Sequence, residues 1–64
     1  MSATPSLATM LQQCEGLLGT KDINNFEEEF LSDNVERFND AKSTTWMSEK
    51  QIAVLERLWR KHFA

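Results

Sequence analysis

The sequence predicts a small all-α protein folded as a three-helix bundle, and three observations support this prediction. Apolar residues recur at the three- and four-residue spacing of a helix face in the segments 5–18, 24–39 and 48–63. Each segment begins at, or directly after, a residue type that caps helix N-termini. No segment shows the alternation of apolar and polar residues that is typical of a strand. Because the connections are only about four to eight residues long, we expect sequence neighbours to pack together in a single helical domain, 1–64.

The first helix is predicted over residues 5–18. Thr4 is a suitable N-cap, and Pro5 suits the first helical position, where its missing N–H group leaves no hydrogen bond unmade. Gly19 is placed to end the helix. The apolar stripe of this segment consists of Leu7, Met10, Leu11, Cys14, Leu17 and Leu18.

The second helix is predicted over residues 24–39. Asn24 and Glu27 have the spacing of a capping box, in which each side chain accepts a hydrogen bond from the other residue's backbone. Asn39 and Asp40 favour helix ends, so the stop is expected there. The apolar positions are Phe26, Phe30, Leu31, Val35 and Phe38.

The third helix is predicted over residues 48–63. Ser48 and Gln51 form a second capping box, and Met47 and Ile52 have the spacing of a hydrophobic staple. Its apolar face comprises Ile52, Leu55, Trp59 and Phe63. The core predicted for the whole bundle consists of Leu7, Met10, Leu11, Cys14, Leu18, Phe26, Phe30, Val35, Phe38, Ile52, Leu55, Leu58 and Trp59.

A chain of 64 residues buries only about 60% of the surface that its unfolded form exposes, so its stability should be marginal. Cys14 is the only cysteine and His62 the only histidine, which excludes an internal disulfide and a Cys/His zinc site. We interpret Cys14 as a small buried hydrophobe and His62 as a structural residue near a helix C-terminus. No cofactor or metal is expected.

Charge is unevenly distributed along the chain. Residues 1–47 hold three basic and eight acidic side chains, a balance of −5, whereas residues 48–64 hold four basic and two acidic ones, a balance of +2. The longest uninterrupted apolar run, 52–55, is far shorter than the ~20 residues of a membrane span, and no secretory leader is evident. We therefore expect a cytoplasmic protein that does not enter a membrane.

The most suggestive surface feature is a basic stripe on the third helix. At about 100° per residue, Lys50, Arg57 and Lys61 fall on one side of the helix, opposite its apolar face. Arg60 is left out because Glu56 stands four residues before it, at the spacing of an ion pair. Two interpretations stay open. The stripe either contacts phosphate or an acidic partner, or it is the ordinary basic charge of a final helical turn.

Two further features have a plain and a functional interpretation. Trp46 either covers the end of the bundle or stacks on a base or partner surface beside the basic stripe. Glu27, Glu28 and Glu29 either form a solvated face at a helix start, where negative charge is favourable, or dock on a basic partner. Their spacing is not that of a calcium-binding loop.

Three short segments carry a resemblance to a known family: Leu11-x-x-Cys14, Phe26-Glu27-x-x-Phe30-Leu31, and Ser48-Glu49-Lys50-Gln51 followed by Leu55 and Leu58-Trp59. In order and spacing they resemble the small accessory proteins associated with the UvsW recombination helicase of T-even bacteriophages. The resemblance implies a non-enzymatic helper in phage DNA recombination, repair and replication, which acts with a DNA helicase in the host cytoplasm. It transfers no binding residues, so the assignment of Lys50, Arg57, Lys61 and Trp46 to DNA comes from the charge pattern.

Two functions are therefore carried forward. The first is a helicase accessory module that makes weak DNA contacts through its basic C-terminal helix. The second is an acidic protein that inhibits a host factor by mimicking nucleic acid. The acidic side chains for this second role would be Glu27, Glu28, Glu29, Asp33 and Glu36. A Gly-rich phosphate loop and a nucleophile–base pair are both missing from the sequence, so we expect no enzyme. The sequence leaves the choice between a monomer and a weak dimer open.

Overall fold

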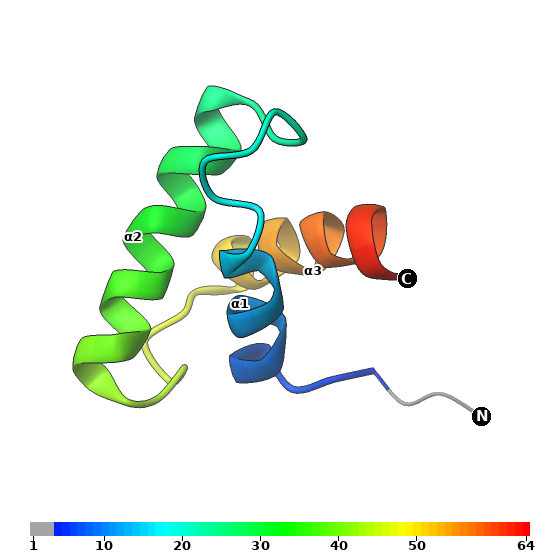
Figure 1. Ribbon diagram of the computed structural model, residues 1–64. Coiled ribbons are helices and arrows are strands. Elements are labelled where there is room, and N and C mark those ends of the chain that lie inside the picture. Colours follow the sequence, from blue (N-terminus) through cyan, green and yellow to red (C-terminus); the bar gives the residue numbers. More distant parts are fainter. Residues whose placement is uncertain (1–3) are drawn as a thin grey trace.

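The computed structural model describes residues 4–64, which contain three α-helices and no strand. These are α1 (Leu7–Glu15), α2 (Asn25–Ala41) and α3 (Glu49–Phe63), and they confirm the predicted all-α three-helix architecture. Residues 1–3 of the predicted domain lie outside the described range. The short α1 lies between α2 and α3 (Figure 1). The axis of α3 runs across the direction of α2 (Figure 1). Helix α1 packs against both of its neighbours, whereas α2 and α3 approach each other closely at very few points.

The start of α1 corrects the sequence prediction. Ser6 is the N-cap instead of Thr4, and its Oγ accepts a hydrogen bond from the backbone N–H of Thr9 at 3.2 Å. Pro5 precedes the helix and does not occupy its first turn. The prediction failed because three neighbouring residues all suit a helix start, and the hydroxyl that reaches the third helical amide decides among them.

The end of α1 also comes earlier than predicted. The helix stops at Glu15, with Gly16 as the C-cap, and the chain continues in tight turns such as the 2.8 Å bond from the Leu17 N–H to the Cys14 carbonyl. Gly19 does adopt the left-handed conformation that suits a chain stop, with φ of 80°, but it closes the turns that follow the helix. Glycine is a poor helix former, which accounts for the break at Gly16.

The predicted capping box at the start of α2 is confirmed. Asn24 Oδ1 accepts a hydrogen bond from the Glu27 N–H at 2.8 Å, and Glu27 Oε1 accepts one from the Asn24 N–H at 2.9 Å. The helix runs to Ala41, slightly beyond its predicted end. There Lys42 turns into the left-handed conformation, with φ of 59°, and its N–H bonds the Phe38 carbonyl at 2.8 Å.

The start of α3 follows the prediction as well. Ser48 Oγ accepts a hydrogen bond from the Gln51 N–H at 3.2 Å, and Gln51 Oε1 accepts one from the Ser48 N–H at 2.8 Å. Met47 belongs to the buried core and Ile52 packs against that core, as expected for staple residues. Among residues 4–64, no helix combines the length and the apolar character needed to cross a membrane.

The buried core gathers around α1. It consists of Met10, Leu11, Cys14, Leu31, Val35, Met47, Leu55 and Leu58. Three predictions about it are wrong: Phe26 is 64% exposed instead of buried, and Leu31 and Met47, which the predicted core omitted, are both buried. Because α2 turns Leu31 and Val35 toward the core, Phe26, which lies about 140–180° around the helix from them, faces solvent. Phe63, predicted on the apolar face of α3, is 42% exposed.

Two polar contacts tie the helices to each other. The indole Nε1 of Trp59 on α3 donates to Gln13 Oε1 on α1 at 2.5 Å. The backbone N–H of Gly19 donates to Glu28 Oε1 at 3.1 Å, which fastens the first connection to α2. Both hydrogen bonds are exposed, and the first links α3 directly to α1.

Candidate functional site

The three cations of the predicted basic stripe are all exposed on α3. At about 100° per residue, Lys50, Arg57 and Lys61 lie well over 100° around the helix from the buried Leu55 and about 60–100° from the buried Leu58. The three are not equivalent, however. Lys61 Nζ lies 4.0 Å from Glu27 Oε2, so this cation is directed toward α2.

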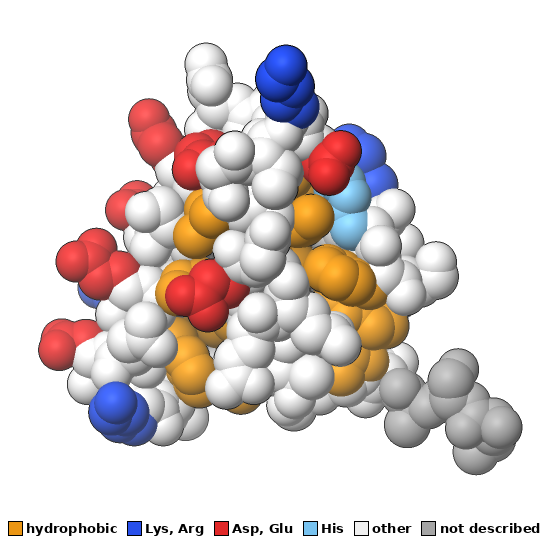
Figure 2. Space-filling view, viewed as in Figure 1, with side chains coloured by type: hydrophobic (Ala, Val, Ile, Leu, Met, Phe, Trp, Pro, Cys, Tyr) orange, Lys and Arg blue, Asp and Glu red, His pale blue; other side chains and the backbone are white. Residues whose placement is uncertain are grey.

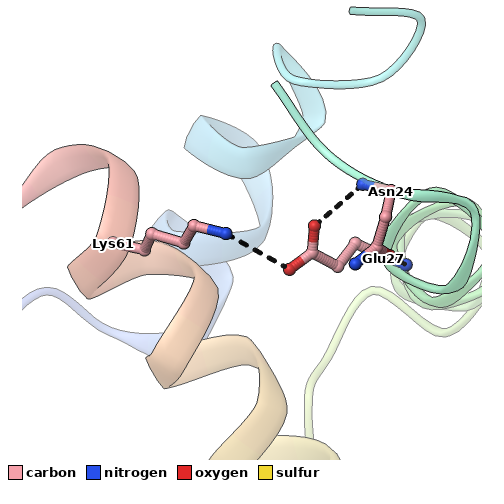
Figure 3. Close-up of polar contacts among 3 residues, drawn as sticks. All are labelled: Asn24, Glu27 and Lys61. Atoms are coloured by element: carbon pink, nitrogen blue, oxygen red, sulfur yellow. Dashed lines mark hydrogen bonds and ion pairs between the residues drawn. The ribbon is translucent and has the colours of Figure 1, made fainter. Parts of the chain in front are cut away.

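Glu27 has two partners at once (Figure 3). One carboxylate oxygen accepts the Asn24 N–H of the capping box, and the other faces Lys61. The Glu27 side chain is only 15% exposed, against 59% for Lys61. A residue predicted to bind a partner protein and a residue predicted to bind DNA are therefore paired with each other. A phosphate group would have to compete with Glu27 for the lysine.

Arg60 replaces Lys61 as an available cation. The expected Glu56–Arg60 pair does not form, since Lys61–Glu27 is the one ion pair within 4.0 Å among residues 4–64. An exposed ion pair at this spacing stabilises a helix by only ~0.3–0.5 kcal/mol. This gain hardly offsets the side-chain entropy that is lost when the pair forms. Arg60 is exposed, as are Lys50 and Arg57. These three residues, Lys50, Arg57 and Arg60, are called the α3 basic surface below.

Trp46 is half-buried against the core at the end of the bundle. Its Nε1 donates to the Ser43 carbonyl at 2.5 Å, and the guanidinium carbon of Arg37 lies 5.5 Å from the ring centroid. The geometry is that of a cation–π contact. A base could stack on the ring face that Arg37 covers only if Arg37 moved, and no local pattern in the sequence predicts Arg37 as the neighbour of Trp46.

The predicted acidic cluster divides into residues with different roles. Glu27 caps α2 and Glu28 binds the Gly19 N–H, and both are half-buried, whereas Glu29 is exposed. Acidic side chains instead gather over α2 along one edge of the molecule (Figure 2). At about 100° per residue, four exposed residues fall within roughly 60° of one another on this helix. This acidic stripe consists of Glu29, Asp33, Glu36 and Asp40.

A groove of about 290 Å³ lies between α2 and the first turn of α3, and Gln51 is its lining residue from α3. Asn34, which is only 4% exposed, lines the groove from α2. Asn34 was not among the residues predicted to be functional. The available signal was a polar residue three positions after Leu31, on the side of the helix that faces the core.

Cys14 is fully buried, and burial raises the pKa of its thiol from 9.0 to about 11. A thiol of this kind is a poor nucleophile at neutral pH. His62 is half-buried, and its Nε2 has no hydrogen-bond partner. Within residues 4–64, no group of three or more His, Cys, Asp or Glu side chains is arranged to hold a metal ion.

Comparison of the chain with protein-family models, with curated proteins and with solved structures found no match. The function is therefore argued below from the surfaces of the molecule.

Proposed function

We propose that the protein is a non-enzymatic accessory module of DNA-processing machinery, which contacts DNA beside a helicase through the α3 basic surface. One observation carries this proposal. Lys50, Arg57 and Arg60 are exposed on the same helix, and among residues 4–64 none of them has a carboxylate within ion-pair distance. The helicase setting, in phage DNA recombination, repair and replication, rests on the resemblance given above. The buried, weakly acidic thiol of Cys14 agrees with a role without catalysis.

The charge distribution requires DNA binding to be weak on its own. Three cations engage about three phosphates, which gives a salt dependence of log affinity against log salt of roughly −3. The acidic stripe on α2 repels DNA and directs the molecule to approach it with α3 first. A helicase that holds the module next to DNA raises its effective concentration, so that weak contacts of this kind become significant.

The test is an NMR titration of the ¹⁵N-labelled protein with a short single-stranded and a short duplex DNA, at low and at raised salt. We expect chemical-shift changes confined to α3 that fade as salt rises. The double variant R57E/R60E should lose these changes. The matched control K21E/K42E reverses two exposed charges away from α3 and should keep them. Absence of shifts at low salt, or equal losses in both variants, would contradict the proposal.

A second candidate function is supported by the acidic stripe on α2. Its four exposed carboxylates form an extended anionic surface, as an inhibitor that mimics nucleic acid would require. Neutralisation in the variant E29Q/D33N/E36Q/D40N separates the two functions. The helicase-accessory function predicts that DNA binding persists or strengthens in this variant. The inhibitor function predicts that the wild type binds a basic DNA-binding protein such as a histone-like HU dimer, and that the variant does not.

A further inference from the structure

The groove between α2 and α3 carries an inference beyond DNA contact. Its lining includes Phe26, Glu29, Phe30, Asp33 and Asn34 of α2 together with Gln51 of α3. None of these residues belongs to the α3 basic surface. Its volume of about 290 Å³ is at the lower limit for a ligand pocket, which suits a single side chain better than a whole cofactor.

Asn34 gives the groove an unmet hydrogen-bonding requirement. Its Nδ2 donates to the Phe30 carbonyl at 2.6 Å. A carbonyl can only accept, so the amide nitrogen must face Phe30 and the amide oxygen must face away from it. This Oδ1 is buried and has no hydrogen-bond partner. Burying a polar group in this state is costly, and an N–H donor that reaches Oδ1 as the side chains covering it move aside would relieve the cost.

Phe26 supplies an exposed aromatic surface beside the amide. The ring is 64% exposed and stacks on Phe30, with centroids 6.4 Å apart and planes inclined by 23°. A large aromatic side chain left in water at the mouth of a groove offers both apolar area and a π-face to an occupant. The stack also holds the Phe26 ring in place before anything binds.

Charge at the rim selects a cation. Glu29 and Asp33 line the groove, and both are exposed. Arg37 also lines it, but its guanidinium is positioned over the Trp46 ring. The two carboxylates lie one helical turn apart, so a cation placed between them interacts favourably with both.

We propose that this groove binds an arginine side chain presented by a segment of a partner protein. Arginine meets all three requirements together. Its guanidinium has several N–H donors for Asn34 Oδ1, a positive charge for Glu29 and Asp33, and a flat face that stacks on the Phe26 ring. Lysine has the charge and donors but no flat face, and an aliphatic side chain has neither charge nor donors.

The probes are three synthetic peptides that differ at one position, with an arginine, a lysine or a norleucine in an otherwise neutral, uncharged sequence. They are titrated into the ¹⁵N-labelled full chain. We expect the arginine peptide to shift the Asn34 side-chain amide and the amides around Phe26. It should bind at least about threefold more tightly than the lysine peptide, and the norleucine peptide should not bind. Equal affinity for arginine and lysine would overturn the proposal, because simple charge attraction would then suffice.

Three variants locate the binding. E29Q/D33N and Phe26→Ala should each weaken the arginine peptide several-fold. E36Q/D40N removes the same charge from the acidic stripe outside the groove and should leave the affinity unchanged. Equal weakening by both double variants would overturn the proposal. R57E/R60E should bind the peptide normally, which separates this site from the proposed DNA contact. Shifts at the groove that grow with protein concentration alone would identify a second copy of the chain as its occupant and would also overturn it.

Discussion

Lys61 in the last turn of α3 lies 4.0 Å from Glu27 in the first turn of α2. The pair joins two helices that otherwise approach each other closely at very few points. It also places positive charge near the C-terminal end of one helix and negative charge near the N-terminal end of the other, where each is favourable. The contact therefore has a structural role, and it makes Lys61 less available to bind DNA.

Substitutions at the two ends of this pair should have unequal effects on stability. Lys61→Ala removes only an exposed ion pair, so the free energy of unfolding should fall by less than ~0.5 kcal/mol, and the loss should vanish at high salt. Glu27→Ala also removes the hydrogen bond to the Asn24 N–H, so it should cost ~1 kcal/mol. Urea unfolding followed by far-UV circular dichroism measures both changes.

Glu27→Gln is the control for this comparison. Glutamine retains an oxygen that can accept the capping hydrogen bond but loses the charge that faces Lys61. Its stability should therefore match that of Lys61→Ala. A Lys61→Ala variant as unstable as Glu27→Ala would show that the ion pair is the larger contribution.

The capping box of α3 should be sensitive to loss of one hydroxyl group. Ser48→Ala removes the acceptor for the Gln51 N–H and should lower the free energy of unfolding by ~1 kcal/mol. Ser32→Ala is the matched control, because Ser32 is exposed in the interior of α2, where alanine is the better helix former. The control should be neutral or slightly stabilising. Equal destabilisation in both variants would rule out the cap as the cause.

The corrected core predicts opposite outcomes at two apolar positions of α2. Leu31→Ala should cost ~2–5 kcal/mol, since Leu31 is fully buried. That is a large part of the roughly 3–10 kcal/mol expected for a domain of this size. Phe26→Ala should cost less than ~1 kcal/mol, because most of the ring is already in water. Thermal unfolding of the two variants would reveal the difference directly, and similar losses would contradict the placement of Phe26.

Cys14 should make stability fall in alkaline solution. Burial raises the pKa of its thiol from 9.0 to about 11, so the folded state favours the protonated form. This contribution is fully present below pH 9 and is lost as the pH rises from there through 11. Over this pH range, the free energy of unfolding should fall less in Cys14→Ala than in the wild type. A thiol reagent at pH 8 should modify the wild type only as fast as it unfolds, and rapid labelling would refute the burial.

Local signals account for the parts of the fold that the sequence predicted correctly. The capping boxes at Asn24 and Ser48 need only residues three apart, so they are visible in the sequence. At the start of α1, Thr4, Pro5 and Ser6 all satisfy the same local rules, and the prediction chose the wrong one. The helix types and their approximate limits therefore follow from the sequence, whereas the exact start and end of α1 and the end of α2 required the structure.

Tertiary packing accounts for what the sequence could not reveal. On α2, Phe26 and Leu31 point about 140° apart, and the position of α1 decides which of them is buried. The exposure of Lys50 and Arg57 follows from helical spacing alone. The pairing of Lys61 with Glu27 does not, because it depends on how two helices far apart in the sequence are brought together.

The position of α1 has a consequence for communication across the molecule. The α3 basic surface lies on α3, and most of the groove between α2 and α3 is formed by α2. Both helices pack against α1, whereas they approach each other closely at very few points. Energetic coupling between two sites needs a packed element whose placement both of them influence. The nine residues of α1 form such an element, so the shortest helix of the protein adds an indirect route between a ligand on α2 and a ligand on α3 to the direct ones through Gln51 and the Lys61–Glu27 pair.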